Sequence, residues 1–484
     1  MPNPEQNIRR NLLFNFTGQI ILKLLSFLFT ITIVRQLGTS NFGTYSTVVA
    51  FVGIFAVFSE LGINNYAVRE IAKDHNQAAR LFANMVAIRL VFGILVLVIE
   101  TGLAWVLGYS TLVIGLIAFT NITIFIYAVQ GPLQTILEGF ERYDLTAVFN
   151  IVYQLVFIGT GALFLLAGFG VPGVIGASFC GALALTFVSY RAARRFTRLS
   201  SKIEFRSWLP LILFGLPFCI TTFATLVSFK VDTVLLSLWR LPTEVGWYSV
   251  AYNLVFTLLS LFLSFTGALV PSLSRKYQED PAAVTRFFLG SVRYLWMLGL
   301  PIAVGTTFIA ERLIVLLYGE PYAPAGMVLQ ILIWVLPVLV LTTLCGAVTT
   351  VFHLERKTAR INIINATFNI LLNLWAIQNY GLLGAAFMTV ATEVLGLAQF
   401  MVLLRGHLAV SRVVIELLHP IIPVIFMASL LILLGELTVF LEIPLAGGFY
   451  LLVLVLTGGL PFTVVKRVFQ MVIARFAFRR LATK

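Results

Sequence analysis

Long apolar runs, separated by short polar or Gly/Pro-containing connectors, cover almost the whole chain. A helix of about 20 apolar residues is long enough to cross the hydrocarbon core of a bilayer. The pattern therefore predicts an all-α, polytopic membrane protein with about fourteen transmembrane helices. The expected spans are 11–34, 44–66, 81–107, 110–135, 146–168, 171–194, 209–238, 245–271, 287–310, 327–350, 360–379, 382–404, 418–440 and 446–466.

Composition supports this prediction, because 60% of the residues are hydrophobic and 11% are charged. Soluble domains carry about 25% charged residues. The first apolar run is too long for a cleavable signal peptide. A net charge of +13 would indicate nucleic-acid binding in a soluble protein. Here the positive-inside rule explains it, and no nucleic-acid partner is expected.

The distribution of Lys and Arg predicts the orientation. With the N-terminus inside, the outer connectors carry Arg35, Arg240 and Arg312, and nearly all of the other basic residues fall on the inner side. Such a bias favours cytoplasmic N- and C-termini. The inner (cytoplasmic) membrane is the location that the family resemblance given below implies.

Three matched motifs, each six spans apart, indicate an internal duplication. The motif GTYS at 43–46 is echoed by GWYS at 246–249, ER at 141–142 by 355–356, and GVPG at 170–173 by GLLG at 381–384. Because six is even, both halves enter the membrane in the same sense, and a pseudo-twofold axis along the membrane normal should relate them. The expected organisation is an N-lobe at 1–207 (spans one to six), a C-lobe at 208–405 (spans seven to twelve), and two extra spans with a basic amphipathic tail at 406–484. The tail is expected to lie on the membrane surface against anionic lipid.

The first span carries a lysine near its middle, where a charge is costly in hydrocarbon. Lys23 shares a sector about 80° wide with Asn15, Gln19, Ser26 and Thr30, and the rest of the helix is apolar. A narrow polar face of this kind is typical of a helix that lines a wet cavity or meets a ligand. The alternative for Lys23 is a salt bridge to a buried carboxylate.

Two further spans have similar polar faces. Span seven aligns Thr225, Ser228 and Asp232, and span eight aligns Asn253 and Thr257. Cavity lining is the favoured interpretation because spans one and seven are equivalent under the duplication. The alternative is that such side chains bond helices to one another, and this is favoured for the asparagine stripe of span eleven, which includes Asn369 and Asn373.

Other charged residues within spans are candidates for a coupling or anion site. Glu393 is central in span twelve, Glu60 lies toward the inner end of span two, and Lys230 faces away from the polar side of span seven. Asp232 lies in the outer part of its span, where hydration is the alternative to a cavity role. Arg89 lies near the inner interface, where snorkelling to the surface is its expected behaviour.

The sequence contains no recognisable catalytic constellation. It lacks the phosphate-binding P-loop, the GxSxG nucleophile motif and the HExxH zinc motif. Its three cysteines lie in apolar runs and form no metal-binding pattern. We therefore expect no enzymatic activity, no cofactor and no metal site.

Several motifs resemble those of the polysaccharide transporter branch, including the O-antigen flippases, of the multidrug/oligosaccharidyl-lipid/polysaccharide exporter superfamily. They include VRQLGTSNFGTYS at 34–46, SELGINNYAVREIAK at 59–73, ILEGFERYDL at 136–145, LLYGEPYAPAGMVLQIL at 316–332 and HLERKTARINIINATFN at 353–369. The resemblance implies a flippase that moves a polyprenyl-pyrophosphate-linked oligosaccharide across the cytoplasmic membrane by alternating access, for polysaccharide biosynthesis. The polar faces would meet the sugars, and Lys23, with Lys230 and Arg89 as further candidates, would offset the pyrophosphate charge.

Two other classes of function remain open on the sequence. One is a cation-coupled exporter of small amphipathic drugs with Glu393 or Asp232 as its proton site. The other is a structural membrane subunit or an integral glycosyltransferase, although the outer connectors are short for a catalytic loop. For the flippase, the expected partners are the lipid-linked oligosaccharide, membrane lipids, a polysaccharide polymerase and glycosyltransferases.

Overall fold

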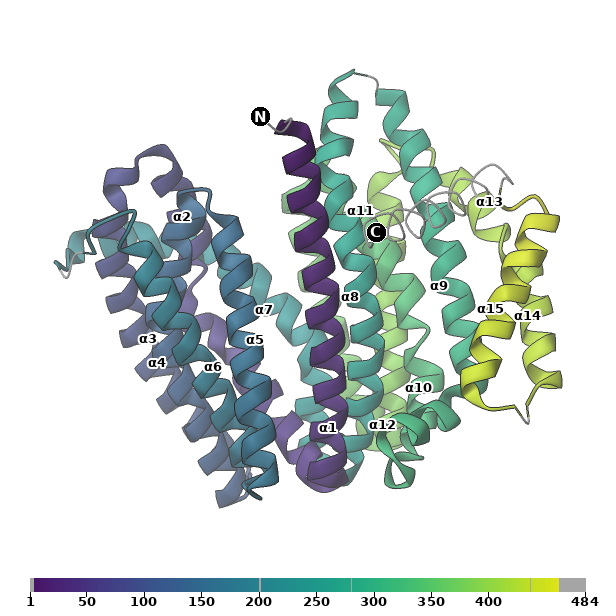
Figure 1. The fold of residues 1–484 in the computed structure, drawn as a ribbon, viewed down its shortest axis with the longest axis horizontal. Coiled ribbons are helices and arrows are strands. Elements are labelled where there is room, and N and C mark those ends of the chain that lie inside the picture. Colours follow the sequence, from purple (N-terminus) through teal and green to yellow (C-terminus); the bar gives the residue numbers. More distant parts are fainter. Residues whose placement is uncertain (1–3, 200–201, 280, 436, 461–484) are drawn as a thin grey trace, which may run out of the picture. The chain divides into compact units, whose positions relative to one another are not determined.

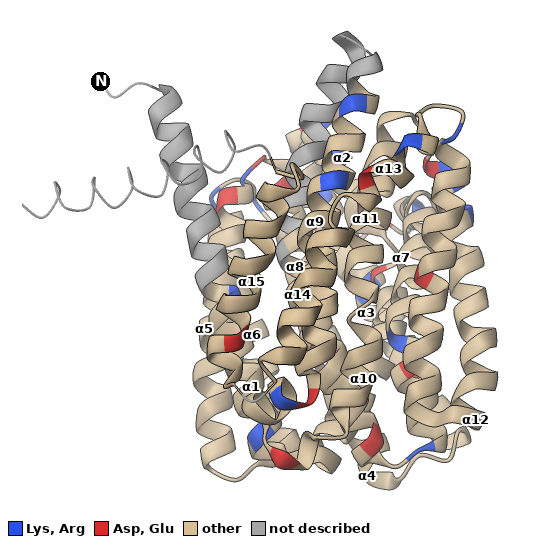
Figure 2. Ribbon diagram, turned by 90° about the vertical axis from the view of Figure 1, so that its right-hand side faces the viewer, with Lys and Arg blue, Asp and Glu red and all other residues tan. Residues whose placement is uncertain are grey.

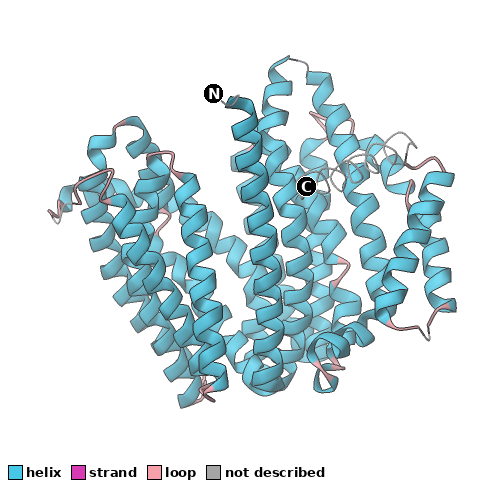
Figure 3. Ribbon diagram, in the orientation of Figure 1, coloured by secondary structure: helices cyan, strands magenta, loops and turns pink. Residues whose placement is uncertain are grey.

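The computed structural model describes the backbone of most of the chain, in residues 4–199, 202–279, 281–435 and 437–460. Side chains of 4–21, 261, 263–279 and 281–283 lie outside this description. Within the described part the regular structure is helical (Figure 3), which confirms the predicted all-α class.

The helices follow one another with short connectors (Figure 1). Their bounds are α1 Pro4–Glu60, α2 Ile63–Lys73, α3 Ala78–Val106, α4 Thr111–Gly139, α5 Tyr143–Leu166, α6 Gly170–Ala193, α7 Trp208–Trp239, α8 Pro242–Glu279, α9 Pro281–Tyr318, α10 Ala325–Leu332, α11 Val335–Val351, α12 Glu355–Leu404, α13 Val413–Leu418, α14 Ile421–Leu433 and α15 Val439–Leu456. Short 3-10 helices are η1 His75–Gln77, η2 Phe205–Ser207, η3 Glu320–Tyr322 and η4 Val410–Arg412.

In the described residues, eleven helical segments are long and apolar enough to cross a membrane. Two of them, in α1 and α12, each cover two predicted spans and are broken by a glycine. Gly38 (φ 73°) and Gly381 (φ 60°) take backbone conformations that side chains with a Cβ disfavour. The predicted span 245–271 falls in α8, part of which lies outside the described side chains.

Several predicted span limits are wrong. Span fourteen was expected at 446–466, but α15 runs from Val439 to Leu456, and span ten (327–350) is divided between α10 and α11. Span two was expected to run to residue 66, but α1 ends at Glu60, and Leu61 and Gly62 have positive φ before α2 begins. Span thirteen was expected to reach residue 440, but α14 ends at Leu433 and residues 439–440 already belong to α15. These errors arise because a window of about 20 residues averages hydropathy over a turn that is only a few residues long.

The chain packs into two compact units, each described here by itself. Unit 1 is Met1–Val250, Leu317–Tyr322 and Asn362–Met388, and unit 2 is Ala251–Leu316, Ala323–Ile361 and Thr389–Lys484. These units follow packing, whereas the lobes 1–207 and 208–405 and the region 406–484 were inferred from the duplication and stay a prediction.

The core of unit 1 forms around the short amphipathic helix α2. Ile63, Ala67 and Ile71 lie at four-residue spacing on one face, and all three are fully buried. They pack in one cluster with apolar side chains of α3, α4 and α7. Away from this buried cluster, the side chains of Val98 and Leu163 are 64% and 65% exposed, as expected for side chains that face lipid.

The core of unit 2 includes a cluster where α14 and α15 pack against α9. It joins Met297 and Leu300 to Met427, Leu431 and Tyr450, and the Tyr450 hydroxyl donates a hydrogen bond to the Met297 carbonyl at 2.7 Å. The two helices beyond the predicted duplication are therefore integral to this unit. Charged residues are sparse along the middle of the helices (Figure 2).

Within unit 1, the two copies of the Gly-x-Tyr-Ser motif meet through their glycines. A Cβ on Gly43 would overlap the carbonyl group of Pro242, and a Cβ on Gly246 would overlap the carbonyl group of Thr39. Each glycine thus touches the residue four positions before the other. A reciprocal contact of this kind is compatible with a local twofold axis, and the duplication inferred from the repeated motifs stays a prediction.

We expect Gly43→Ala to destabilise the protein by about 1–3 kcal/mol, because a methyl group would overlap backbone atoms that have little room to move. Gly53→Ala is the matched control in α1, since a Cβ there would meet nothing within 4 Å, and it should be neutral or stabilising by up to about 1 kcal/mol. Thermal unfolding in detergent measures both. Equal unfolding midpoints for the two variants would contradict the close contact between Gly43 and the backbone of Pro242.

Unit 2 contains an ion pair that joins α9 to α15, between a partly exposed arginine and a buried carboxylate. Arg312 contacts both carboxylate oxygens of Glu442, at 3.0 and 2.9 Å, and Glu442 is fully buried. We expect Arg312→Met to cost about 3–5 kcal/mol, because it leaves the carboxylate buried without a partner. The double variant Arg312→Met/Glu442→Leu should recover most of this loss in the same unfolding measurement. A double variant no more stable than the single one would show that the ion pair is not the reason.

Candidate functional site

The polar face of α1 begins the candidate site in unit 1. Asn15 and Gln19 lie outside the described side chains. Lys23 and Ser26 are both partly buried. The hydroxyl of Ser26 donates to the carbonyl of Leu22 at 2.7 Å, and Thr30 donates to the carbonyl of Ser26 at 2.9 Å.

The polar face of α7 has the same hydrogen-bonding pattern. Thr225 donates to the Thr221 carbonyl at 2.9 Å, and Ser228 donates to the Ala224 carbonyl at 3.0 Å. Each hydroxyl hydrogen is therefore used within its own helix, while the oxygen lone pairs remain available. Faces built in this way offer hydrogen-bond acceptors, which suit a ligand rich in hydroxyl donors. Lys230, on the same helix, is partly buried.

Asp232, predicted to line a cavity, is buried, so the alternative that it is simply hydrated is wrong. It is 1% exposed, and its carboxylate accepts hydrogen bonds from the Tyr248 hydroxyl at 2.9 Å and from the Asn373 side-chain amide at 2.8 Å. These contacts join α7 to the first part of α8 and to the middle part of α12 within unit 1. Asn373 thus bonds one helix to another, as favoured for the asparagine stripe.

Arg89 does not snorkel, contrary to expectation. Its side chain is 2% exposed, and its guanidinium donates to the Tyr127 carbonyl at 2.8 Å and to the Asn64 side chain at 3.1 Å. Glu60, 49% exposed, lies 3.4 Å from the same guanidinium. Gly131 gives the guanidinium its space, because a Cβ there would overlap it. The structure therefore brings together two of the predicted site residues, Arg89 and Glu60, in one ion pair.

The remaining predicted site residues belong to unit 2. Asn253, Thr257 and Glu393 are all partly buried there. Thr257 donates to the Asn253 carbonyl at 2.7 Å, which repeats the intrahelical pattern of α1 and α7.

Sequence reasoning missed three side chains that stabilise buried polar groups across helices. Tyr248, Asn64 and Asn121 each bind a buried charged or carboxyl side chain on another helix. Tyr248 could have been identified from the sequence, since it belongs to the repeated Gly-x-Tyr-Ser motif. Asn121 pairs with the fully buried Glu100 at 2.7 Å, and no spacing rule connects residues of two different helices.

Comparison with known proteins gives relatives in sequence. Residues 8–277 match the family described as polysaccharide biosynthesis protein. The chain is 20% identical over 360 residues to a Haloferax volcanii protein named probable low-salt glycan biosynthesis flippase Agl15, which covers 73% of this chain and 74% of that protein. It is 24% identical over 417 residues to probable flippase AglR of the same organism, with coverage of 80% and 79%.

Solved structures with a similar fold include a flippase and a multidrug resistance transporter. Lipid II flippase MurJ, in an inward closed conformation, matches with a TM-score of 0.76 at 14% identity, over 91% of this chain and 97% of that chain. An inward-facing MATE family multidrug resistance transporter of the MOP superfamily matches with a TM-score of 0.65 at 16% identity, over 78% and 94%. At these identities the likeness establishes the fold.

We expect Tyr248→Phe to destabilise the protein by about 1–3 kcal/mol, because the buried carboxylate of Asp232 loses a hydroxyl donor while the ring is kept. Tyr66→Phe is the matched control in the same unit, since the Tyr66 ring stacks on Phe214, and its change should stay within about 0.5 kcal/mol. Thermal unfolding of the purified protein measures both. An unchanged midpoint for Tyr248→Phe would show that the hydrogen bond contributes nothing.

Proposed function

Since the chain belongs to the polysaccharide biosynthesis protein family, we propose that it is a flippase for lipid-linked glycans. The proposed substrate is a polyprenyl-pyrophosphate-linked oligosaccharide, which the protein moves across the cytoplasmic membrane by alternating access. The product serves polysaccharide biosynthesis. The names of the Haloferax volcanii relatives, both probable flippases, support the proposal.

The physical task of such a flippase is to carry a hydroxylated, anionic headgroup through hydrocarbon. Polar groups without partners cost several kcal/mol each in this medium, and a charge costs more. The lipid tail is already soluble in the membrane. The protein therefore has to supply hydrogen-bond partners for sugars and a positive charge for the pyrophosphate.

The observation that carries the proposal is the pair of acceptor faces on α1 and α7. The hydroxyls of Ser26, Thr225 and Ser228 direct their hydrogens to their own helices, so their free lone pairs suit sugar hydroxyls. Lys23 lies on the α1 face one helical turn from Ser26, and an ammonium group is a suitable partner for a phosphate oxygen. Together these groups match the two chemical parts of the headgroup.

The proposed function also implies a location in the cell and partner enzymes. The protein would be a multi-pass protein of the cytoplasmic membrane with both termini in the cytoplasm, as the distribution of basic residues predicts. It would act as a transporter with no enzymatic step of its own. Glycosyltransferases would supply its substrate and a polysaccharide polymerase would use the product.

A second candidate is a cation-coupled exporter of small amphipathic drugs. The buried carboxylate of Asp232 favours it, because intramembrane carboxyl groups are typical proton or cation sites in transporters. Drug resistance in an overexpressing strain separates the two functions. A raised inhibitory concentration for several drugs, without any change in surface glycan, would support the exporter.

We expect Lys23→Ala to lower the rate of glycan translocation at least about tenfold, because a charge-assisted contact to phosphate contributes about 1.5–3 kcal/mol. The measurement is the appearance of glycan on the outer side of cells that carry the variant as their sole copy. Immunoblotting of the membrane fraction checks that the variant is inserted.

Two variants make this experiment specific. Lys23→Arg retains a positive charge and should retain more activity than Lys23→Ala. Lys73→Ala removes a lysine from the exposed end of α2, where it pairs with Glu70 at 2.8 Å, and should leave translocation unchanged. Normal surface glycan in Lys23→Ala would remove the proposed role of this lysine.

A further inference from the structure

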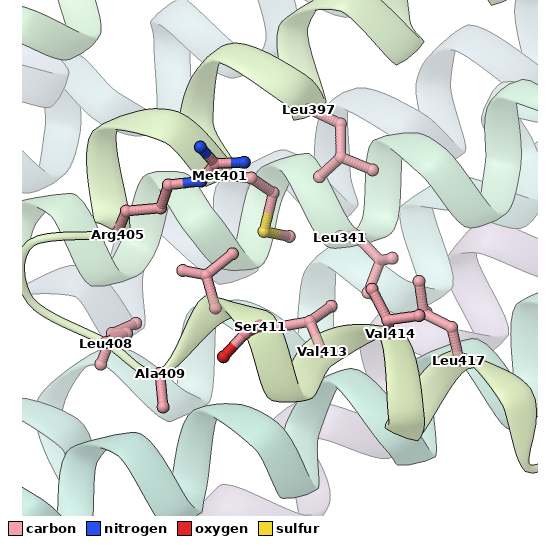
Figure 4. Close-up of a pocket in the computed structure, with 11 residues that line it drawn as sticks. Leu341, Leu397, Met401, Arg405, Leu408, Ala409, Ser411, Val413, Val414 and Leu417 are labelled. Carbon is pink, nitrogen blue, oxygen red and sulfur yellow. The ribbon is translucent and has the colours of Figure 1, made fainter.

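A cavity of about 580 Å³ lies within unit 2, and none of the residues of the polar faces described above lines it. Its walls come from α11, from the end of α12 and from the segment that contains η4 and α13 (Figure 4). Leu397 and Met401 share a face of α12, and Arg405 follows at the same four-residue spacing directly after the helix ends at Leu404. The volume is within the range of sites that hold small molecules.

The lining has a sharply divided chemistry. Nine of its eleven residues are apolar, and the polar ones are Arg405 and Ser411. Arg405, Leu408 and Ala409 lie at one end of the cavity, and Leu341, Leu397 and Leu417 lie at the other (Figure 4). A matching ligand therefore has a long apolar part and a small anionic part.

Arg405 is available to such a ligand. Its side chain is exposed, and among the ion pairs of the described residues none involves it. Arg412, in η4 close by in sequence, is also exposed and adds positive charge beside the cavity. A guanidinium group binds phosphate oxygens with two parallel hydrogen bonds.

We propose that this cavity binds an anionic phospholipid, with an acyl chain between its apolar walls and the phosphate on Arg405. The walls of the cavity add little driving force, because the acyl chain leaves a lipid environment that is equally apolar. The headgroup charge therefore sets the affinity, as in other basic pockets between membrane helices. The inference is independent of the transported substrate.

The lining also argues for a phospholipid over a lipid-linked glycan. Two polar side chains, Arg405 and Ser411, are too few to satisfy the many hydroxyl groups of an oligosaccharide. They are sufficient for one phosphate and a glycerol oxygen. The occupant is thus a lipid with a small headgroup, such as phosphatidylglycerol.

The test is native mass spectrometry of the purified full-length protein, titrated with dioleoyl phosphatidylglycerol or dioleoyl phosphatidylcholine in detergent. We expect the wild type to retain phosphatidylglycerol in preference to phosphatidylcholine. Arg405→Gln should weaken retention of phosphatidylglycerol about fivefold, the effect of roughly one basic contact, and leave phosphatidylcholine unchanged. Arg405→Lys should retain phosphatidylglycerol less well than the wild type and better than Arg405→Gln.

Two controls make the assignment to this cavity specific. Arg412→Gln removes a nearby charge that does not line the cavity, and it should reduce retention less than Arg405→Gln does. Leu397→Trp fills the cavity and should reduce retention without a change of charge. Equal retention of phosphatidylglycerol by the wild type and Arg405→Gln would overturn the proposal. Polyprenyl phosphate that displaces phosphatidylglycerol at equal concentration would also overturn it, in favour of the carrier lipid.

Discussion

Polar groups inside a membrane have no water to bind, so each of them needs a partner from the protein. This constraint explains the contacts of the polar residues in unit 1. Hydroxyls such as that of Ser228 bind a carbonyl of their own helix, Arg89 binds groups on three other segments, and Asp232 accepts from two donors. The intrahelical pattern has a further consequence, because it satisfies the hydroxyl hydrogen and leaves an acceptor for a ligand.

A second constraint is close approach of backbones, which small residues permit between membrane helices. The reciprocal contact between Gly43 and Gly246 depends on the absence of a side chain at both positions. It also ties the two copies of a repeated motif to one another. The two motifs from which a duplication was predicted are therefore packed against each other. Alternating access, as proposed for this protein, uses two such related halves that change their contacts.

Much of the fold could be predicted from the sequence, because hydropathy reflects the free-energy cost of exposing polar groups to lipid. The helical class and the approximate spans followed from it. The turn before α15 was missed, although residues 434–438 (LGELT) include a glycine and two polar residues, because a window of about 20 residues averages hydropathy over so short a segment. The burial of Arg89 was also missed, because its partners Asn64 and Tyr127 come from other helices. Whether Lys23 meets an anionic headgroup stays a prediction.

The central claim is that this chain moves a lipid-linked glycan between the two leaflets of a membrane. The most direct measurement reconstitutes the purified wild-type protein into vesicles that contain a polyprenyl-pyrophosphate-linked oligosaccharide. A membrane-impermeant glycosidase then reports how fast the glycan in the inner leaflet reaches the outside. We predict complete digestion in vesicles with the protein and about half in empty vesicles, where one leaflet is protected. Equal digestion in both, with the protein correctly inserted, would contradict the account.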